Sequence, residues 1–384
     1  MMTKRTIIGF DAKRIVRNRT GLGSYGRTLV NDLAQREDLQ LRLYAPDAGH
    51  DGLRRQVPER DNLCYCYSPS SSWPFHKQWW RSRGIVSDLR RDGVQLYHGL
   101  SGELPIGIRR SGIKSVVTIH DLIFLRHPEF YHWIDTKLYA WKFRQTVREA
   151  DHIIAISECT KRDIMELGDV DESRISVIYQ SYAPHFKKPL SIHHPPSSIH
   201  HPPSTTKYIL NVGTIERRKN ILLAVKALAL LPDDLKLVII GRHTPYADEV
   251  RAYAEKHGLA ERLLMLHDIS NEQLPPYYAH AETFVYPSVY EGFGIPIIEA
   301  ISSGLPVVAC TGSCLEEAGG PDALYVAPDD VQGMASAILQ TLRGATGREQ
   351  RIERSQEYIR RFEGSDVAAQ VVDVYRRLIA EAGY

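Results

Sequence analysis

Cysteine is scarce in this sequence, and no two of its cysteines show C-x-x-C spacing; the five are Cys64, Cys66, Cys159, Cys310 and Cys314. An odd number without that spacing argues against a disulfide framework or structural zinc site and favours a reducing cytoplasm. No window of ~18 uncharged apolar residues is present, so we expect no membrane span. The longest apolar candidate, Ile221–Leu231, contains Lys226. The first residues, MMTKRTIIGFD, lack the apolar h-region of a secretory signal.

Length and composition are those of a soluble globular protein. The 384 residues are 43% hydrophobic and 24% charged, and at about 150 residues per domain they predict two or three domains. The net charge is only +2, but residues 51–120 hold 11 Lys and Arg against 6 Asp and Glu. This basic region favours phosphate groups or an anionic membrane surface, or is ordinary surface variation. We expect no nucleic-acid partner.

Short β-branched runs alternate with longer amphipathic segments along the chain. Strands are expected at Thr6–Phe10, Gln40–Tyr44, Val94–Tyr97, Ser115–Ile119, His152–Ile156, Tyr208–Val212, Lys236–Ile240, Leu263–Leu266, Thr283–Tyr286 and Pro306–Ala309. Helices are expected at Ser24–Ala34, Ile134–Glu149, Ile221–Leu230, Ala247–His257, Pro296–Ser302 and Asp366–Ala382. Strand–helix alternation predicts the α/β class, with doubly wound parallel sheets covered on both faces.

A tandem copy of SIHHPPS at residues 191–204 separates the two series of strands. Repeated Pro-Pro and Ser cannot build a packed core, so we expect a linker at a domain junction. Its four histidines could bind a metal, but an unstructured duplication is the favoured interpretation. We therefore predict an N-terminal domain over 1–183, a linker over 184–206, a C-terminal domain over 207–363, and a final helix over 364–384.

Gly21, Gly23 and Gly26 spell G-x-G-x-x-G, the letters of a dinucleotide-binding loop. Such a loop should leave the first strand directly, but ten residues, Asp11–Thr20, intervene here. A helix with Ser24 as its N-cap is expected to follow, so its free N–H groups could still face an anion. A phosphate or sugar is the favoured ligand, ahead of a plain turn or NAD. Gly26 is expected only to pack the helix.

Two carboxylates occur in the segment V-Y-P-S-V-Y-E-G-F-G-I-P-I-I-E, which ends at Glu299. One is expected in a loop and the other on a helix. Glu291 follows a strand, and Gly292 and Gly294 leave backbone N–H groups open to a ligand. A helix is expected to begin near Ile295. Ligands of open α/β sheets bind at such strand ends, and carboxylates suit the vicinal diols of sugars. The alternative is that both glutamates are simply solvated or capping residues.

Three further features carry candidate chemistry. In N-V-G-T-I-E-R-R-K-N, the cations Arg217, Arg218 and Lys219 precede a helix and suit a diphosphate, although a solvated basic turn is equally consistent. His120 ends a strand and could donate to a substrate oxygen, or be a buried structural histidine. The aromatic and basic stretch Trp73–Arg83 either meets a membrane surface or packs a core helix.

Taken together, these segments resemble retaining glycosyltransferases of the GT-B fold, in family 4. E-G-F-G-I-P-I-I-E is similar to the family's E-x7-E motif, and G-T-I-E-R-R-K-N to its G-T-x-E-P-R-K-N segment, with Arg217 where proline is common. The segments at 154–164, 269–281 and 303–309 also look like family segments. The resemblance covers nearly the whole chain except 184–206, and the SIHHPPS duplication is foreign to it.

The resemblance implies two Rossmann-like domains facing a cleft, with the final helix crossing back to the first domain. It assigns catalytic roles to Arg218 and Lys219 at the donor diphosphate, to Glu291 at the donor sugar, and to His120 near the acceptor. The donor-binding positions that match are Gly21, Gly23, Gly213, Gly292, Phe293, Gly294, Ile295 and Glu299, with Glu299 on the ribose hydroxyls. No metal or cofactor is implied.

The implied reaction moves a hexose from a nucleoside diphosphate sugar to a saccharide or lipid-linked acceptor in surface polysaccharide synthesis. GDP-mannose is the first candidate donor, with UDP-glucose, UDP-galactose and UDP-GlcNAc open. A cytoplasmic enzyme at the inner face of the membrane is expected. The alternatives are a nucleotide-sugar epimerase of the same fold, a dinucleotide oxidoreductase and a non-catalytic sugar-binding protein. Gly23→Val is expected to impair catalysis far more than folding.

Overall fold

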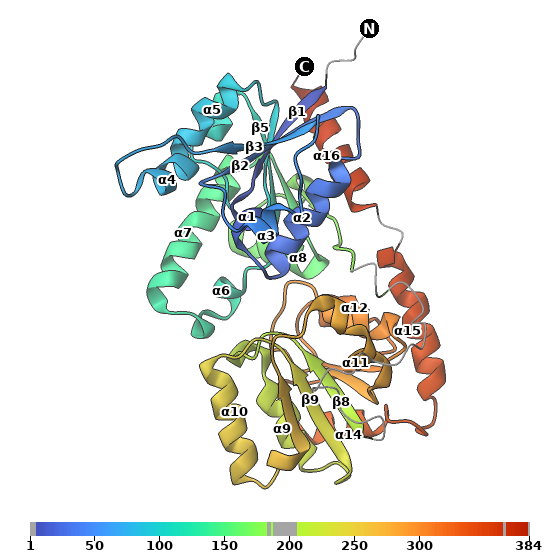
Figure 1. Ribbon diagram of the computed structural model, residues 1–384. Helices are drawn as coiled ribbons and strands as arrows, with labels where there is room; N and C mark the ends of the chain where they lie inside the picture. Colours follow the sequence, from blue (N-terminus) through green and yellow to red (C-terminus); the bar gives the residue numbers. More distant parts are fainter. Residues whose placement is uncertain (1–4, 183–185, 187–205, 364–365, 383–384) are drawn as a thin grey trace. The chain divides into compact units, whose positions relative to one another are not determined.

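The computed structural model describes residues 5–182, 186, 206–363 and 366–382. The chain divides into two compact units, one formed by Met1–Gln180 with Ser365–Tyr384 and the other by Ser181–Gly364. Each is a parallel sheet with helices packed on it (Figure 1). The linker expected over 184–206 and the histidines of its duplication lie outside the described residues, apart from Phe186 and Thr206.

The sheet of the first unit has the order β3-β2-β1-β4-β5-β6-β7 among the described residues, and every neighbouring pair is parallel. Its strands are β1 (Thr6–Asp11), β2 (Leu39–Ala45), β3 (Leu63–Tyr67), β4 (Leu96–Gly99), β5 (Lys114–Ile119), β6 (His152–Ala155) and β7 (Ile175–Val177). Alternate residues point to opposite faces, so Val116 and Val117 enter two different cores. Both faces are therefore covered.

Helices from distant parts of the sequence cover these two faces. One core combines β1 and β2 with α1 (Lys13–Arg17), α2 (Gly21–Leu33) and α16 (Val367–Glu381). The other combines β4 to β6 with α5 (Ile85–Arg91), α7 (Trp133–Glu149) and α8 (Glu158–Gly168). The shorter helices are α3 (Asp51–Arg54), α4 (His76–Trp79), the π-helix η1 (Trp80–Gly84) and α6 (Ile123–Arg126).

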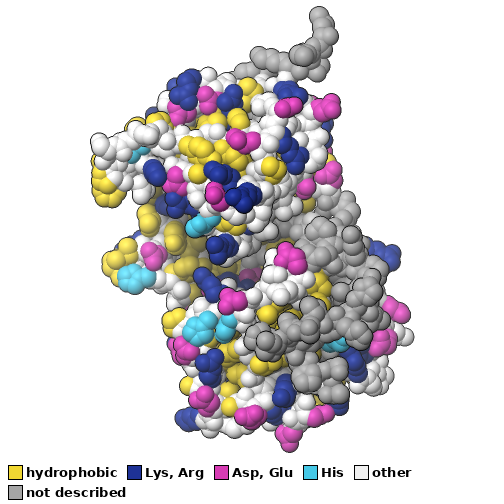
Figure 2. Space-filling view, viewed as in Figure 1, with side chains coloured by type: hydrophobic (Ala, Val, Ile, Leu, Met, Phe, Trp, Pro, Cys, Tyr) yellow, Lys and Arg dark blue, Asp and Glu magenta, His cyan; other side chains and the backbone are white. Residues whose placement is uncertain are grey.

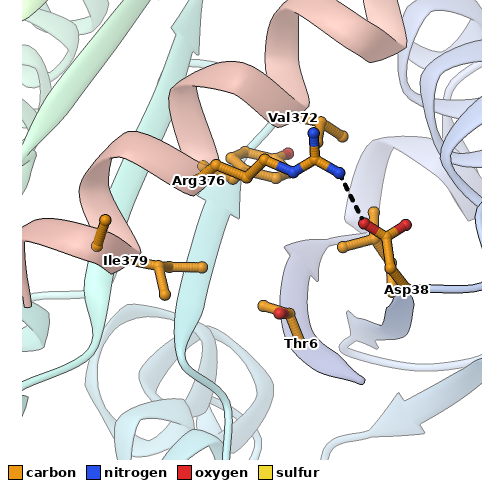
Figure 3. A pocket seen from close by; sticks show the side chains of 8 residues that line it. Thr6, Asp38, Val372, Arg376 and Ile379 are labelled. Carbon is orange, nitrogen blue, oxygen red and sulfur yellow. Dashed lines mark hydrogen bonds and ion pairs between the residues drawn. The ribbon is translucent and has the colours of Figure 1, made fainter. Parts of the chain in front are cut away.

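The C-terminal helix α16 is an integral part of the first unit. The hydroxyl of Tyr375 lies 2.6 Å from Nδ1 of His98 on β4. Arg376 donates to Asp38 at 3.0 Å beside a small pocket where Val372 and Ile379 face the starts of β1 and β2 (Figure 3). The last helix of the chain therefore follows the second unit in sequence but completes the core of the first.

The start of α2 corrects one prediction. The helix begins at Gly21 with Thr20 as its N-cap, so Ser24 lies inside the helix and is not its cap. The carbonyl of Thr20 accepts from Gly23 and Ser24 at 3.0 and 3.1 Å, because Asn18 already fixes Thr20 through its side-chain oxygen. The predicted glycine loop is thus the first turns of a helix, and α1 occupies the gap before it.

The sheet of the second unit has the order β10-β9-β8-β11-β12-β13 in the described part of the chain, again parallel throughout. Its strands are β8 (Lys207–Val212), β9 (Leu235–Ile240), β10 (Leu263–Leu266), β11 (Thr283–Tyr286), β12 (Val307–Cys310) and β13 (Leu324–Val326). Every predicted strand is present within two residues at each end. The strands β3, β7 and β13 were not predicted from the sequence.

The helices of the second unit are α9 (Ile221–Leu228), α10 (Pro245–Lys256), α11 (Pro275–His280), α12 (Ile295–Ser302), α13 (Leu315–Gly319), α14 (Val331–Leu339) and α15 (Arg348–Glu363). The apolar faces of α9, α10 and α14 pack with β8 and β9 into one core. Because the strands are parallel, the loops that follow β8 and β11 leave the sheet at the same edge. These loops carry the charged residues singled out from the sequence.

Candidate active site

The basic segment lies directly after β8. Arg217–Lys219 form one turn of 3₁₀ helix, η6, before α9 begins at Ile221. Asn220 joins the two elements in the left-handed conformation, with φ 52°, and its side-chain amide donates to the carbonyl of Pro328 at 2.8 Å. The carbonyl of Arg218 accepts from the N–H of Val289 at 2.9 Å, which ties η6 to the loop after β11.

Glu291 lies in that loop and meets both cations. Its Oε2 lies 2.8 Å from Nη1 of Arg218, and its Oε1 is paired with Nζ of Lys219. The three side chains are only 12–16% exposed. The structure therefore brings Glu291 to two cations that lie more than 70 positions before it in the sequence, and places all three residues at the carboxyl edge of the second sheet.

The electrostatics of this cluster follow from its geometry. Burial alone would raise the pKa of Glu291, but Lys219 and Arg218 outweigh it and hold that pKa at about 2. Burial likewise opposes the charge of Lys219, yet Glu291 raises the pKa of Lys219 above its usual value. All three groups are therefore charged at neutral pH.

The hydrogen bonds to Glu291 do not use all the N–H donors of either cation. Lys219 also donates to the hydroxyl of Tyr286 at 2.7 Å, and Arg218 to the carbonyl of Tyr290 and to Glu216, both at 2.7 Å. An ammonium group has three N–H donors and a guanidinium five. Within the described part of the chain, each cation thus keeps at least one N–H without a partner. An oxyanion could accept from these donors.

Sequence reasoning missed the residues that hold this cluster. Tyr286 ends β11, and its ring also lies 4.9 Å from Nζ of Lys219. Cys314 donates its thiol to the carbonyls of Phe293 at 2.6 Å and Glu291 at 3.1 Å, and so fixes the loop. The position of Tyr286 at a strand end beside the glutamate loop was the available signal; Cys314 gave none.

The glycines of the segment have different roles. Gly213 and Gly294 have φ 152° and 129°, where glycine is favoured. A Cβ on Gly213 would lie 3.9 Å from Nζ of Lys219, so this residue lines the cluster. The helix α12 begins at Ile295, directly after Gly294, as predicted.

Gly292 lies in the loop between Glu291 and α12, whereas the side chain of Phe293 packs away from solvent. Its ring meets Phe362 with centroids 5.4 Å apart, and the residue is 3% exposed. The side chain of Phe293 is therefore not open to a ligand.

Glu299 lies one turn into α12. The hydroxyl of Tyr278 on α11 donates to its Oε2 at 3.2 Å. Burial raises the pKa of Glu299 to about 7, with Tyr278 acting in the opposite direction. Glu291 and Glu299 thus differ by several units of pKa, because only Glu291 has cations beside it.

His120 follows β5 in the first unit and has both ring nitrogens engaged. Its Nε2 lies 2.9 Å from the carbonyl of Leu100, which can only accept, so Nε2 carries the proton. Nδ1 must then accept from the side-chain amide of Gln180 at 3.0 Å. Burial lowers the pKa of His120 to about 4. The imidazole is therefore neutral with a fixed tautomer, and Gln180 is a further residue that was not predicted from the sequence.

The glycines of α2 also lie in the first unit. A Cβ on Gly23 would stand 2.0 Å from the carbonyl oxygen of Asn18, whereas one on Gly21 would meet nothing within 4 Å. Gly26 packs against Ile15, as expected. Gly23→Val would thus disturb the fold itself, which corrects the expectation that it impairs catalysis far more than folding. Gly21 is the position with open space.

Metal sites and membrane spans are two further features to consider in the described residues. These residues contain no group of three or more His, Cys, Asp and Glu side chains placed to hold a metal ion. Among them, too, no helix combines the length and apolar character needed to cross a membrane.

Comparisons with known proteins agree on one family. Residues 19–182 match the family model described as Glycosyltransferase Family 4, and residues 197–358 match that of Glycosyl transferases group 1. O-antigen chain mannosyltransferase B of Escherichia coli is 31% identical over 378 residues, covering 94% of this chain and 96% of that protein. O-antigen chain mannosyltransferase RfbU of Salmonella typhimurium is 29% identical over 225 residues, or 59% of this chain and 60% of that one.

Solved structures share the architecture. Sucrose-phosphate synthase from Thermosynechococcus elongatus superimposes with a TM-score of 0.78 at 20% identity, covering 98% of this chain and 100% of that chain. HepE from Anabaena, in complex with UDP and glucose, gives 0.71 at 16% identity, with 97% and 100% covered. The predicted two-domain α/β fold of the GT-B type is confirmed.

Proposed function

The chain belongs to glycosyltransferase family 4, and we propose that it transfers mannose from GDP-mannose to a saccharide or lipid-linked saccharide in surface polysaccharide synthesis. It acts on a nucleotide-sugar donor and a saccharide acceptor. Mannose is supported by the names of its relatives, which include the O-antigen mannosyltransferases of Escherichia coli and Salmonella typhimurium. The comparisons do not favour the alternative of an epimerase.

The observation that carries the proposal is the cluster of Arg218, Lys219 and Glu291. Two cations with unused N–H donors stand at the carboxyl edge of a parallel sheet, where ligands of such sheets bind. We infer that these donors bind the donor diphosphate. Charge-assisted hydrogen bonds to a phosphate oxygen are the strong kind, and they strengthen as the leaving group gains charge. No metal is then required for that step.

Glu291 is inferred to orient rather than attack. Its carboxylate is held by two cations and has a pKa of about 2, which makes it a poor nucleophile. A covalent glycosyl-enzyme is therefore not the favoured route. We propose that the acceptor hydroxyl attacks the anomeric carbon from the side on which the diphosphate departs. The C–O bond to phosphate breaks, the new C–O bond forms, and the hydroxyl proton passes to a phosphate oxygen, so configuration is retained.

His120 is proposed to face the transferred sugar. A neutral imidazole adds no positive charge beside an oxocarbenium-like carbon, and the low pKa of about 4 keeps it neutral. Glu299 is proposed to accept from the ribose hydroxyls of the donor, with Tyr278 holding its carboxyl group. The glycine backbone at Gly213, Gly292 and Gly294 would allow close approach of the donor.

The test is a donor panel assayed with and without acceptor. GDP-mannose, UDP-glucose, UDP-galactose and UDP-GlcNAc are each offered with a mannose-terminated oligosaccharide, and products are separated by mass and by anomeric NMR signals. We expect an α-mannoside and GDP from the first donor only. Epimerised donor without acceptor would establish the epimerase instead. Thermal stabilisation by GDP but not by UDP checks the base independently, since ligand binding to the folded state raises stability.

A further inference from the structure

Exposed tryptophan is concentrated on the first unit. Four of the five tryptophans of the chain are 47–62% exposed, namely Trp73, Trp79, Trp133 and Trp141, whereas Trp80 is 3% exposed. Tryptophan is on average a highly buried residue, so one exposed indole ring is ordinary but four on one unit are not. Their arrangement indicates what they contact.

The longer part of this arrangement is one stripe of α7. Trp133, Ile134, Leu138 and Trp141 are 62%, 53%, 46% and 48% exposed. At 100° per residue they share one side of the helix. The residues that α7 buries against the core lie on the opposite side: Phe143, Thr146 and Val147. The helix α7 therefore has two apolar faces, one packed in the core and one exposed to solvent.

The shorter part lies between 73 and 79. Trp73 contacts Phe75 and Trp79 edge to face, with centroids 6.3 and 6.4 Å apart, and Phe75 is 63% exposed. Gly84 makes room for this cluster, because a Cβ there would lie 2.6 Å from the ring of Trp79. The three rings support one another while remaining open to solvent.

The two parts adjoin in the fold. Glu103 is paired both with Arg81 of η1, which directly follows α4, and with Lys142 of α7, the latter at 3.0 Å. Figure 1 shows α4 and α7 along the same side of the first unit, and Figure 2 shows hydrophobic side chains along that edge. We call Trp73, Phe75, Trp79, Trp133, Ile134, Leu138 and Trp141 the tryptophan surface.

Unpaired cations surround it. Arg83, Lys137 and Arg144 are exposed and form no ion pair among the described residues, while the stretch 73–83 has no Asp or Glu. Lys137 lies 5.0 Å from the ring centroid of Trp133. Asp135, in the first turn of α7 but outside the stripe, is an exposed acid. The surface is thus apolar with an excess of positive charge.

We propose that the tryptophan surface docks the enzyme on an anionic lipid bilayer. Indole rings favour the headgroup region, and cations beside them pair with anionic headgroups. A second copy of the chain fits less well, since a two-fold interface would bring the same positive surface against itself. A neutral saccharide would explain the rings but not the cations. This inference deepens the proposed function, on which it rests for the lipid-linked acceptor.

The experiment is sedimentation of the full-length protein with vesicles. Phosphatidylcholine vesicles are compared with vesicles of phosphatidylcholine and phosphatidylglycerol, and tryptophan emission is recorded in parallel. We expect binding to the anionic vesicles, a blue shift of the emission, and weakening by salt. Trp133→Ala with Trp141→Ala, and separately Trp73→Ala with Trp79→Ala, should each lower the partition constant at least about tenfold.

The matched control is the pair Leu230→Ala and Leu339→Ala, because these side chains of the second unit are 45% and 44% exposed. This control should bind as the wild type does. Circular dichroism and thermal midpoints establish that the variants fold. Mannosyl transfer to a water-soluble oligosaccharide should be unchanged in the tryptophan variants, so loss of docking is separated from loss of activity.

Three results would overturn the proposal. The wild type could fail to bind anionic vesicles, or the tryptophan variants could bind them as well as the wild type does. Alternatively, the variants could abolish a concentration-dependent dimer seen without lipid, which would assign the surface to a second copy. Vesicle binding by an enzyme that transfers no sugar would instead refute the proposed function and leave the docking surface standing.

Discussion

Lys219→Ala tests the site most directly. The substitution removes a cation that is 12% exposed and one of the two partners of Glu291. Losing one preorganised donor to a developing oxyanion costs about 10²–10³-fold in kcat. We therefore expect kcat to fall by about that factor, with a smaller effect on the KM for the donor.

The same substitution has a separate effect on folding. Glu291 keeps Arg218 at 2.8 Å, so its carboxylate is not left without a partner. Breaking a fully buried pair costs about 3–5 kcal/mol, but a remaining cation and partial exposure reduce this to roughly 1–2 kcal/mol. The variant should therefore fold, with a lowered thermal midpoint, and GDP release from GDP-mannose can be measured on it.

The chain supplies a matched control on the same turn of η6. Arg217 is 67% exposed and paired with Glu249 at the surface. Arg217→Ala should stay within about twofold of the wild type, because exposed ion pairs contribute little. Equal rates for Lys219→Ala and the wild type, with the control also unchanged, would refute the assignment of the diphosphate to this cluster.

Three further outcomes are expected. Burial raises the pKa of Glu299 from 4.5 to about 7. Between these pH values the native state binds a proton that the unfolded state has lost. The contribution of Glu299 to the free energy of unfolding is therefore present at low pH and lost as pH rises through 7. Relative to Glu299→Gln, the wild type should lose roughly 2–3 kcal/mol of unfolding free energy between pH 5 and pH 8, measured by urea unfolding, and parallel curves would contradict the shift. Gln180→Glu places a carboxylate on Nδ1 of His120 and raises the pKa of that imidazole, so kcat should acquire a new limb in its pH profile, whereas Gln180→Leu should lower kcat without one. Gly21→Ala should leave the thermal midpoint unchanged and Gly23→Val should lower it; equal midpoints would refute the packing account of Gly23.

The pattern of the sequence predicts the fold well where burial is complete on both faces. Such strands are continuous β-branched runs, as at Ser115–Ile119, and their bounds were placed within two residues. The missed strands β7 and β13 have only three residues each, and β3 alternates cysteine with tyrosine at a sheet edge. Short edge strands acquire their conformation from a neighbour, so local composition carries little signal for them.

The site was predictable in its charges but not in their pairing. Arg218, Lys219 and Glu291 stood out by residue type and position, yet no spacing rule says that Glu291 meets both cations. Their contact depends on which strands are neighbours, because β8 and β11 are adjacent although β9 and β10 lie between them in sequence. Tyr286 and Cys314 were missed for the same reason.

The pairing of these charges changes the account of donor binding. Arg218 and Lys219 are balanced by Glu216 and Glu291, so the cluster has no large excess of positive charge with which to attract a diphosphate. What it offers instead is a set of N–H donors held at fixed positions by carboxylates. Fixed donors cost no reorganisation when charge develops on the leaving group, and that advantage is realised in the transition state more than in the bound donor. If the cluster binds the diphosphate as proposed, this geometry favours catalysis over affinity, with Glu291 holding the two cations in place.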